Sequence, residues 1–111
     1  MSFSCAVSGT PRRTTPDREE HLLKIGQEAI ANAVRHSNAS NIRLNVHYGG
    51  DAVTLRVADD GCGLPSPDYK AGDHWGLRTM EERAQQIGGE FHLVSAPGGG
   101  TEVQVVAPLG A

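Results

Sequence analysis

Two pairs of strand-like segments, each joined by a short glycine-rich turn, constrain the fold of this chain most strongly. Apolar and polar residues alternate over residues 42–47 and again over 53–58, and Gly49-Gly50-Asp51 separates the two runs. Period-two alternation is typical of a strand with one buried face, and a short turn between two such strands predicts an antiparallel hairpin. Residues 91–94 and 102–107 predict a second hairpin.

The segment before the first hairpin predicts a helix. Thr15 and Pro16 supply a hydroxyl cap and a favoured first helical residue, and acidic residues follow in the first turn. Apolar residues then recur at helical spacing from Leu22 until the pattern ends near Ser37. We therefore expect a helix over residues 16–36.

A second helix is expected between the hairpins. Residues 61–73 are rich in glycine and proline and have no period, which is typical of a loop. Apolar residues return at helical spacing from Leu77 to Ile87, and Gly88 provides the left-handed residue that helix ends favour. The sequence thus predicts a long loop followed by a short helix.

The order of these elements predicts the fold class. The first fifteen residues indicate an edge strand and a loop, so the order is strand, helix, two strands, loop, helix, two strands. This is not the regular alternation of a parallel doubly wound sheet. We expect one α+β domain over residues 1–111, a two-layer sandwich with helices on one face of a mixed, mostly antiparallel sheet.

Composition excludes several classes of partner. The formal net charge is −3 with both signs interspersed, so no basic surface for nucleic acid is expected. No apolar run approaches the length that spans a bilayer, and we expect neither a membrane segment nor a signal peptide. Cys5 and Cys62 are not spaced for zinc or redox chemistry, which favours a reduced, cytoplasmic setting.

Polar residues border the apolar face of the first predicted helix. Glu28, Asn32, Arg35 and His36 fall at i, i+4, i+7 and i+8, so they share one stripe. Such a stripe taken alone is more often a solvated helix face than a site.

Three further segments carry glycine beside polar groups. Residues 59–63, Asp-Asp-Gly-Cys-Gly, follow a predicted strand and combine acceptor carboxylates with backbone that a ligand can approach closely. Residues 74–77, His-Trp-Gly-Leu, open the second helix, whose free N–H groups suit a phosphate. Residues 99–101, Gly-Gly-Thr, enter the last strand. Each segment alone is also explained by an ordinary turn or helix start.

The order and spacing of these four segments resemble a known family. The helix with Glu28, Asn32 and His36, followed by segments 59–63, 76–77 and 99–101, looks like the N, G1, G2 and final threonine boxes of GHKL ATPases. That superfamily includes gyrase, Hsp90, MutL and histidine kinases. The string from His74 to Ala84 is similar to nitrate-sensor-like histidine kinases. The resemblance implies the Bergerat fold and the ATP-binding catalytic domain of a two-component sensor histidine kinase.

The resemblance assigns an adenine-binding role to the segment after the first hairpin. It implies that Asp59 accepts a hydrogen bond from the adenine amino group, which predicts ATP over GTP because guanine presents an oxygen there. It implies that Gly61 and Gly63 let the backbone pass close to the nucleotide and that Thr101 supports Asp59.

The resemblance also implies how the phosphates are held. Gly76 and Leu77 would direct helix N–H groups at the β- and γ-phosphates. Residues 64–75 would form the ATP lid, beginning at Leu64, which is included among the nucleotide-binding residues. The sequence departs from the superfamily at His74, which occupies the place of the first glycine of the second glycine box.

A Mg²⁺ ion and a catalytic carboxylate are implied on the first helix. Asn32 would offer its amide oxygen to the ion, and Glu28 would orient a metal-bound water or act as a base. Arg35 and His36 would meet the phosphates or the ribose, although a structural hydrogen bond is equally compatible with either residue.

The expected partner of the reaction lies outside this chain. In the resembled class the phosphoryl group goes to a histidine followed by an acidic residue on a dimerisation hairpin, with a response regulator downstream. None of the five histidines here is followed by Asp or Glu. The chain alone should therefore bind ATP and hydrolyse it slowly at most. Two alternatives stay open: a free-standing serine kinase of the anti-sigma-factor type, and a non-catalytic module whose protein contacts depend on nucleotide.

Overall fold

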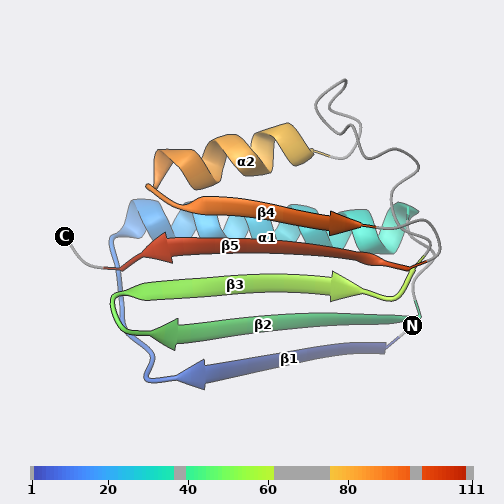
Figure 1. Ribbon diagram of the computed structural model, residues 1–111, viewed down its shortest axis with the longest axis horizontal. Helices are drawn as coiled ribbons and strands as arrows, with labels where there is room; N and C mark the ends of the chain where they lie inside the picture. Colours follow the sequence, from blue (N-terminus) through green and yellow to red (C-terminus); the bar gives the residue numbers. More distant parts are fainter. Residues whose placement is uncertain (1, 37–39, 62–75, 96–98, 110–111) are drawn as a thin grey trace.

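The computed structural model describes residues 2–36, 40–61, 76–95 and 99–109, and for Arg35 and His36 only the backbone is described (Figure 1). Its five strands and two helices follow the order expected from the sequence. They are β1 (Ser2–Gly9), α1 (Pro16–His36), β2 (Asn41–Gly49), β3 (Ala52–Asp59), α2 (Leu77–Gln86), β4 (Glu90–Ser95) and β5 (Thr101–Pro108).

All five strands form one mixed sheet in the order β1-β2-β3-β5-β4. Strand β1 runs parallel to β2, and every other neighbouring pair is antiparallel. Figure 1 shows β1 at one edge of the sheet and β4 at the other. Both predicted hairpins, the predicted edge strand and the α+β class are confirmed.

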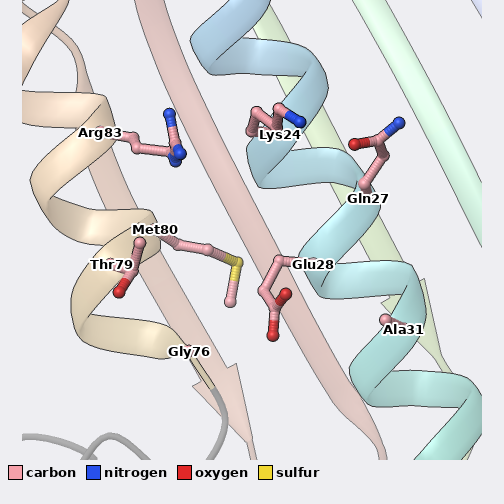
Figure 2. A pocket seen from close by; sticks show the side chains of 8 residues that line it. All are labelled: Lys24, Gln27, Glu28, Ala31, Gly76, Thr79, Met80 and Arg83. Atoms are coloured by element: carbon pink, nitrogen blue, oxygen red, sulfur yellow. The ribbon is translucent and has the colours of Figure 1, made fainter.

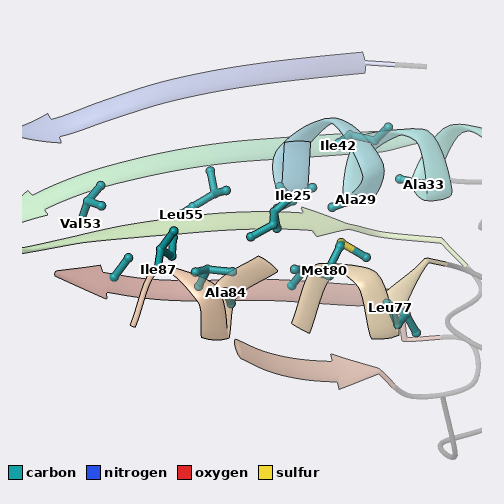
Figure 3. Close-up of a cluster of buried hydrophobic side chains, with 14 of the residues drawn as sticks. Ile25, Ala29, Ala33, Ile42, Val53, Leu55, Leu77, Met80, Ala84 and Ile87 are labelled. Atoms are coloured by element: carbon teal, nitrogen blue, oxygen red, sulfur yellow. The ribbon is translucent and has the colours of Figure 1, made fainter. Parts of the chain in front are cut away.

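The core lies between the sheet and the two helices (Figure 3). Val53, Leu55 and Val57 alternate along β3 with residues that point away, as the period-two pattern predicted. Helix α1 packs against β3, and α2 packs against β4 and α1. Ile25 of α1 and Val105 of β5 are 0% exposed, and burying a side chain of this size contributes about 1.5–3 kcal/mol.

The helix ends form as the sequence predicted. The Thr15 hydroxyl accepts a hydrogen bond from the N–H of Arg18 at 3.2 Å, so it caps α1. After α2, Gly88 adopts a φ of 72°, and the N–H of Gly89 donates to the carbonyl of Ala84 at 2.8 Å. Neither described helix has the length and hydropathy that a bilayer span requires.

Candidate functional site

One group of predicted site residues lies where β3 and β5 meet at one end of the sheet. Asp59 is the last residue of β3, and it pairs with Ile42 of β2 and Thr101 of β5. Asp59 continues the row of Val53, Leu55 and Val57, so its side chain emerges on the face that the helices cover. We call Asp59, Gly61, Gly100 and Thr101 the sheet end of the site.

The Asp59 carboxylate is fixed by a local backbone contact. The N–H of Gly61 donates to its Oδ1 atom at 2.9 Å, which closes a turn around the carboxylate. Gly61 is buried, and Asp59 is half-buried. This contact therefore orients the carboxylate and makes its two oxygens unequal, because Oδ1 and not Oδ2 accepts the Gly61 N–H.

The neighbouring strand is held close to Asp59 by a glycine. Gly100 has a φ of 82°, and a side chain there would overlap the carbonyl of Asp59. Next to it, the Thr101 hydroxyl lies 3.1 Å from the hydroxyl of Ser95, its cross-strand partner on β4. Thr101 is thus positioned both by strand register and by a hydroxyl pair.

The adjacent Asp60 has a different, structural task. Its Oδ1 accepts the backbone N–H groups of Ser40 and Asn41, both at 2.8 Å, and its Oδ2 accepts the side-chain amide of Asn41 at 2.8 Å. The hydrogen bond from the Asn41 backbone is the largest cause that lowers the pKa of Asp60. Asp60 therefore ties the start of β2 to the end of β3.

A shallow hollow of about 270 Å³ adjoins the sheet end. Asp59 and Thr101 border it, but so do Ala58, Val94 and Glu102. By register these three residues project from the face opposite to the helices. The hollow therefore follows the rim of the sheet and is not the helix-side space toward which Asp59 points.

The second group of predicted residues lies between the helices, and we call Glu28, Asn32, Gly76 and Leu77 the helix end. Gly76 precedes α2 with a φ of 67°, and a Cβ atom there would lie 2.6 Å from Oε1 of Glu28. The Glu28 carboxylate thus lies directly against the start of α2. The Leu77 side chain is buried in the core, so its backbone and not its side chain is available at the start of α2. The side-chain oxygen of Asn32 is buried one turn after Glu28.

A groove of about 500 Å³ opens from the helix end between α1 and α2 (Figure 2). Figure 2 shows Glu28 reaching from α1 toward Gly76, while Arg83 reaches from α2 toward α1. Lys24, Gln27 and Met80 also line it. The groove is therefore lined by one carboxylate, that of Glu28, and by two cationic side chains, Lys24 and Arg83.

The donor set of the helix end suits Mg²⁺ better than a metal held by protein alone. Within the described ranges, no three His, Cys, Asp or Glu residues come together to hold an ion. Mg²⁺ commonly takes one or two protein oxygens and completes its octahedron with phosphate and water. The Asn32 amide oxygen and the Glu28 carboxylate, one turn apart, fit that requirement.

Some predicted site residues are not among the residues that the structure describes. They are Gly63, Leu64, the remainder of the expected lid over residues 64–75, and the side chains of Arg35 and His36. Cys62 and His74 also fall outside the described residues. The role expected for each of these residues stays a prediction.

The structure adds residues that sequence reasoning missed. Ser95, Asp60, Lys24 and Arg83 received no role, because each is significant only through a neighbour distant in sequence. Pairing the hydroxyls at the ends of the second hairpin would have indicated Ser95. The sequence has no comparable signal for Arg83, which lies far along the chain from Glu28.

Comparison with known proteins identifies the family. The family described as "Histidine kinase-, DNA gyrase B-, and HSP90-like ATPase" matches residues 17–111. The chain belongs to this family, which confirms the resemblance to GHKL ATPases.

Sensor proteins are among the relatives. The chain is 44% identical over 91 residues to "Sensor protein VraS" from Staphylococcus aureus and from Staphylococcus haemolyticus. The match covers 82% of this chain but 26% of each relative, so the chain spans about a quarter of their length. These relatives support the catalytic ATP-binding domain of a two-component sensor kinase, the main interpretation of the sequence.

Solved structures share the fold. A histidine kinase domain from Erythrobacter litoralis EL346 superimposes with a TM-score of 0.76 at 21% identity, covering 96% of this chain and 55% of that one. The ATP-binding domain of PrrB from Mycobacterium tuberculosis gives a TM-score of 0.73 at 24% identity, covering 98% and 82%. The expected Bergerat-type sandwich is therefore confirmed.

Proposed function

We propose that this chain binds Mg-ATP and presents its γ-phosphoryl group to a histidine on a separate dimerisation hairpin of the same sensor kinase. The observation that carries the proposal is the position of Asp59. Strand register directs its carboxylate to the helix-covered face, and the Gly61 N–H orients it. A fixed acceptor at the rim of a sheet suits an exocyclic amine.

Adenine recognition would follow from the two unequal oxygens of Asp59. Since Oδ1 already accepts from Gly61, Oδ2 is the oxygen placed to accept from the adenine amino group. Guanine has a carbonyl oxygen at the corresponding position, which would face the carboxylate without a proton between them. Thr101, held by register and by Ser95, supports Asp59 from the neighbouring strand.

The phosphates would lie along the helix end. Mg²⁺, when bound, supplies positive charge that bridges and neutralises the phosphate oxygens. Asn32 offers it an amide oxygen, and Glu28 orients a water or an acceptor group beside it. No side chain caps α2 at Gly76, so first-turn N–H groups of α2 would face the phosphates.

The partners of the whole kinase follow from the same proposal. Phosphoryl transfer depends mainly on positioning and charge neutralisation, and the acceptor histidine lies on the hairpin rather than on this chain. We therefore propose one domain over residues 1–111 that works in the cytoplasm, with a response regulator downstream. On its own it hydrolyses ATP slowly at most.

Calorimetric titration of the purified chain with ATP and with GTP, each with Mg²⁺ and with EDTA, tests the proposal. We expect binding of ATP and no detectable binding of GTP. Asn32→Ala should weaken ATP binding about tenfold with Mg²⁺ and leave it nearly unchanged in EDTA, because the lost group is a metal ligand. Equal affinity for the two nucleotides in a folded chain would contradict adenine recognition.

A further inference from the structure

The two edges of the sheet differ in how they are protected. Strand β4 at one edge carries Glu90 and His92, and Oε2 of Glu90 lies 3.4 Å from Nε2 of His92. Strand β1 at the other edge has the sequence SFSCAVSG, which contains neither a charged residue nor a proline. Charged side chains, prolines and short strands are the usual means by which proteins prevent edge strands from pairing with other chains. Strand β1 is therefore an unprotected edge.

The odd-numbered residues of β1 form its free edge. The N–H of Ser2 donates to the carbonyl of Ser40 at 2.7 Å, so the backbone of Ser2 faces β2. Backbone groups of successive strand residues point to opposite sides, so Phe3, Cys5 and Val7 direct their N–H and C=O groups away from β2. Within the described residues, β1 pairs with β2 alone. Each of these three residues thus offers a donor and an acceptor to an incoming strand.

Phe3, Cys5 and Val7 also form an apolar row. Register with β2 places Phe3 beside Ile42 and Val7 beside Val46, two side chains of the helix-covered face. However, α1 packs against β3, and Phe3 and Val7 of the edge strand remain 52% and 58% exposed. The row therefore has apolar surface that a second strand could cover.

We propose that β1 pairs antiparallel with β1 of a second copy of this chain, about a two-fold axis at Cys5. This pairing puts Cys5 opposite its own copy and Phe3 opposite Val7, all residues whose backbone groups face the free edge. Each opposed pair exchanges two N–H···O bonds, and the apolar row continues from one copy into the other. An isologous contact brings like residues together at its axis, where an uncharged strand avoids repulsion. This self-complementarity favours a second copy over an unrelated peptide.

Sedimentation equilibrium of the purified chain, with a thiol reductant and without nucleotide, tests this inference independently of the proposed function. One strand pair is a small interface, so we expect a monomer–dimer equilibrium with a dissociation constant on the order of 100 µM. Cys5→Lys would bring two ammonium groups together at the axis and should weaken association at least about tenfold. Val94→Lys, the matched control, puts the same charge on the exposed side of β4 and should leave the dissociation constant unchanged.

Cross-linking reads the position of the axis. In a Cys62→Ser chain, Cys5 is the only thiol, and opposed Cβ atoms in a sheet lie about 5 Å apart. A short bis-maleimide should therefore link two copies through Cys5. The combination of Cys5→Ser with Ser8→Cys would separate the two thiols by about 20 Å in this register and should slow the cross-linking strongly. Equal rates for the two thiol positions would overturn the pairing at Cys5.

A mixing experiment separates loss of pairing from damage to the fold. Cys5→Glu alone should associate as weakly as Cys5→Lys, but an equimolar mixture of the two variants should recover association because opposite charges meet at the axis. Damaged chains would not recover in this way. A wild-type chain that stays monomeric at about 1 mM, a dimer that survives Cys5→Lys, or a mixture that does not associate would each overturn the inference.

Discussion

The sheet end and the helix end of the candidate site are built in opposite ways. At the sheet end, Asp59 and Thr101 are neighbours because β3 and β5 pair in one register, and Gly100 touches the Asp59 carbonyl. At the helix end, Glu28 meets Gly76 through a long side chain that crosses from one helix to another. Backbone contacts therefore fix the sheet end, and side-chain contacts fix the helix end.

This difference has consequences for substitutions. A change that alters the close backbone approach at the sheet end, as at Gly100, should lower stability as well as nucleotide recognition. A change at the helix end alters a charge or a flexible side chain, so affinity should change with little loss of stability. The substitutions below, at and beside the sheet end, run from the largest expected effect to the smallest.

Asp59→Asn should produce the largest effect. Asparagine can keep the acceptor for the Gly61 N–H, and its amide nitrogen then takes the place of Oδ2 and faces the adenine amino group, donor against donor. We expect ATP affinity to fall by about 100-fold or more in calorimetric titrations. The neighbouring Asp60→Asn variant is the control, and a similar loss there would contradict the separate tasks of the two aspartates.

Gly100→Ala should reduce the free energy of unfolding, measured by urea denaturation. Gly50 is the matched control, because its φ is 60° and nothing lies within 4 Å of the Cβ that alanine would add. Gly50→Ala should cost about 1–2 kcal/mol for the left-handed backbone alone. Gly100→Ala should cost at least about 1 kcal/mol more, since its Cβ overlaps the Asp59 backbone. Equal costs would show that this close approach does not matter.

Replacing Asp60 should have a smaller, pH-dependent effect on the free energy of unfolding. Folding lowers the pKa of Asp60 below its usual value of 3.8, so the ionised carboxylate favours the folded state above that pH. The contribution is lost as the pH falls through the lowered folded-state pKa. Asp60→Asn should therefore be less stable than the wild type at neutral pH, and the difference should shrink below about pH 3.8.

Urea unfolding at several pH values measures this difference. Asp51→Asn removes the same charge from an exposed turn and is the control. A difference between wild type and Asp60→Asn that stayed constant down to about pH 3 would exclude the hydrogen-bonded carboxylate as its source.

Much of the fold could be predicted because its signals are local. The Thr15 cap, the alternating residues of β2 and β3, and Gly88 each act within a few residues, and each element formed as expected. The pairing of β5 with β3 was not predictable from local pattern, since it depends on contacts across more than forty residues.

The candidate site divides in the same way. The sequence predicted that Glu28, Asn32, Asp59 and Thr101 belong to one site only through the resemblance to a family. Residue spacing alone does not reveal which faces of the helices and the sheet meet. The separate tasks of Asp59 and Asp60 depend on where β3 ends and β2 begins, which the Asp-Asp-Gly string does not specify.

Amide NMR of the labelled chain, titrated first with adenosine and then with Mg-ATP, tests the central claim most directly. We expect adenosine to shift the amide signals of Gly61 and Thr101 but not those of Gly76 and Leu77, and we expect Mg-ATP to shift all four. Adenosine that moved Gly76 and Leu77 while Gly61 and Thr101 stayed in place would contradict the assignment of adenine to the sheet end and phosphates to the helix end.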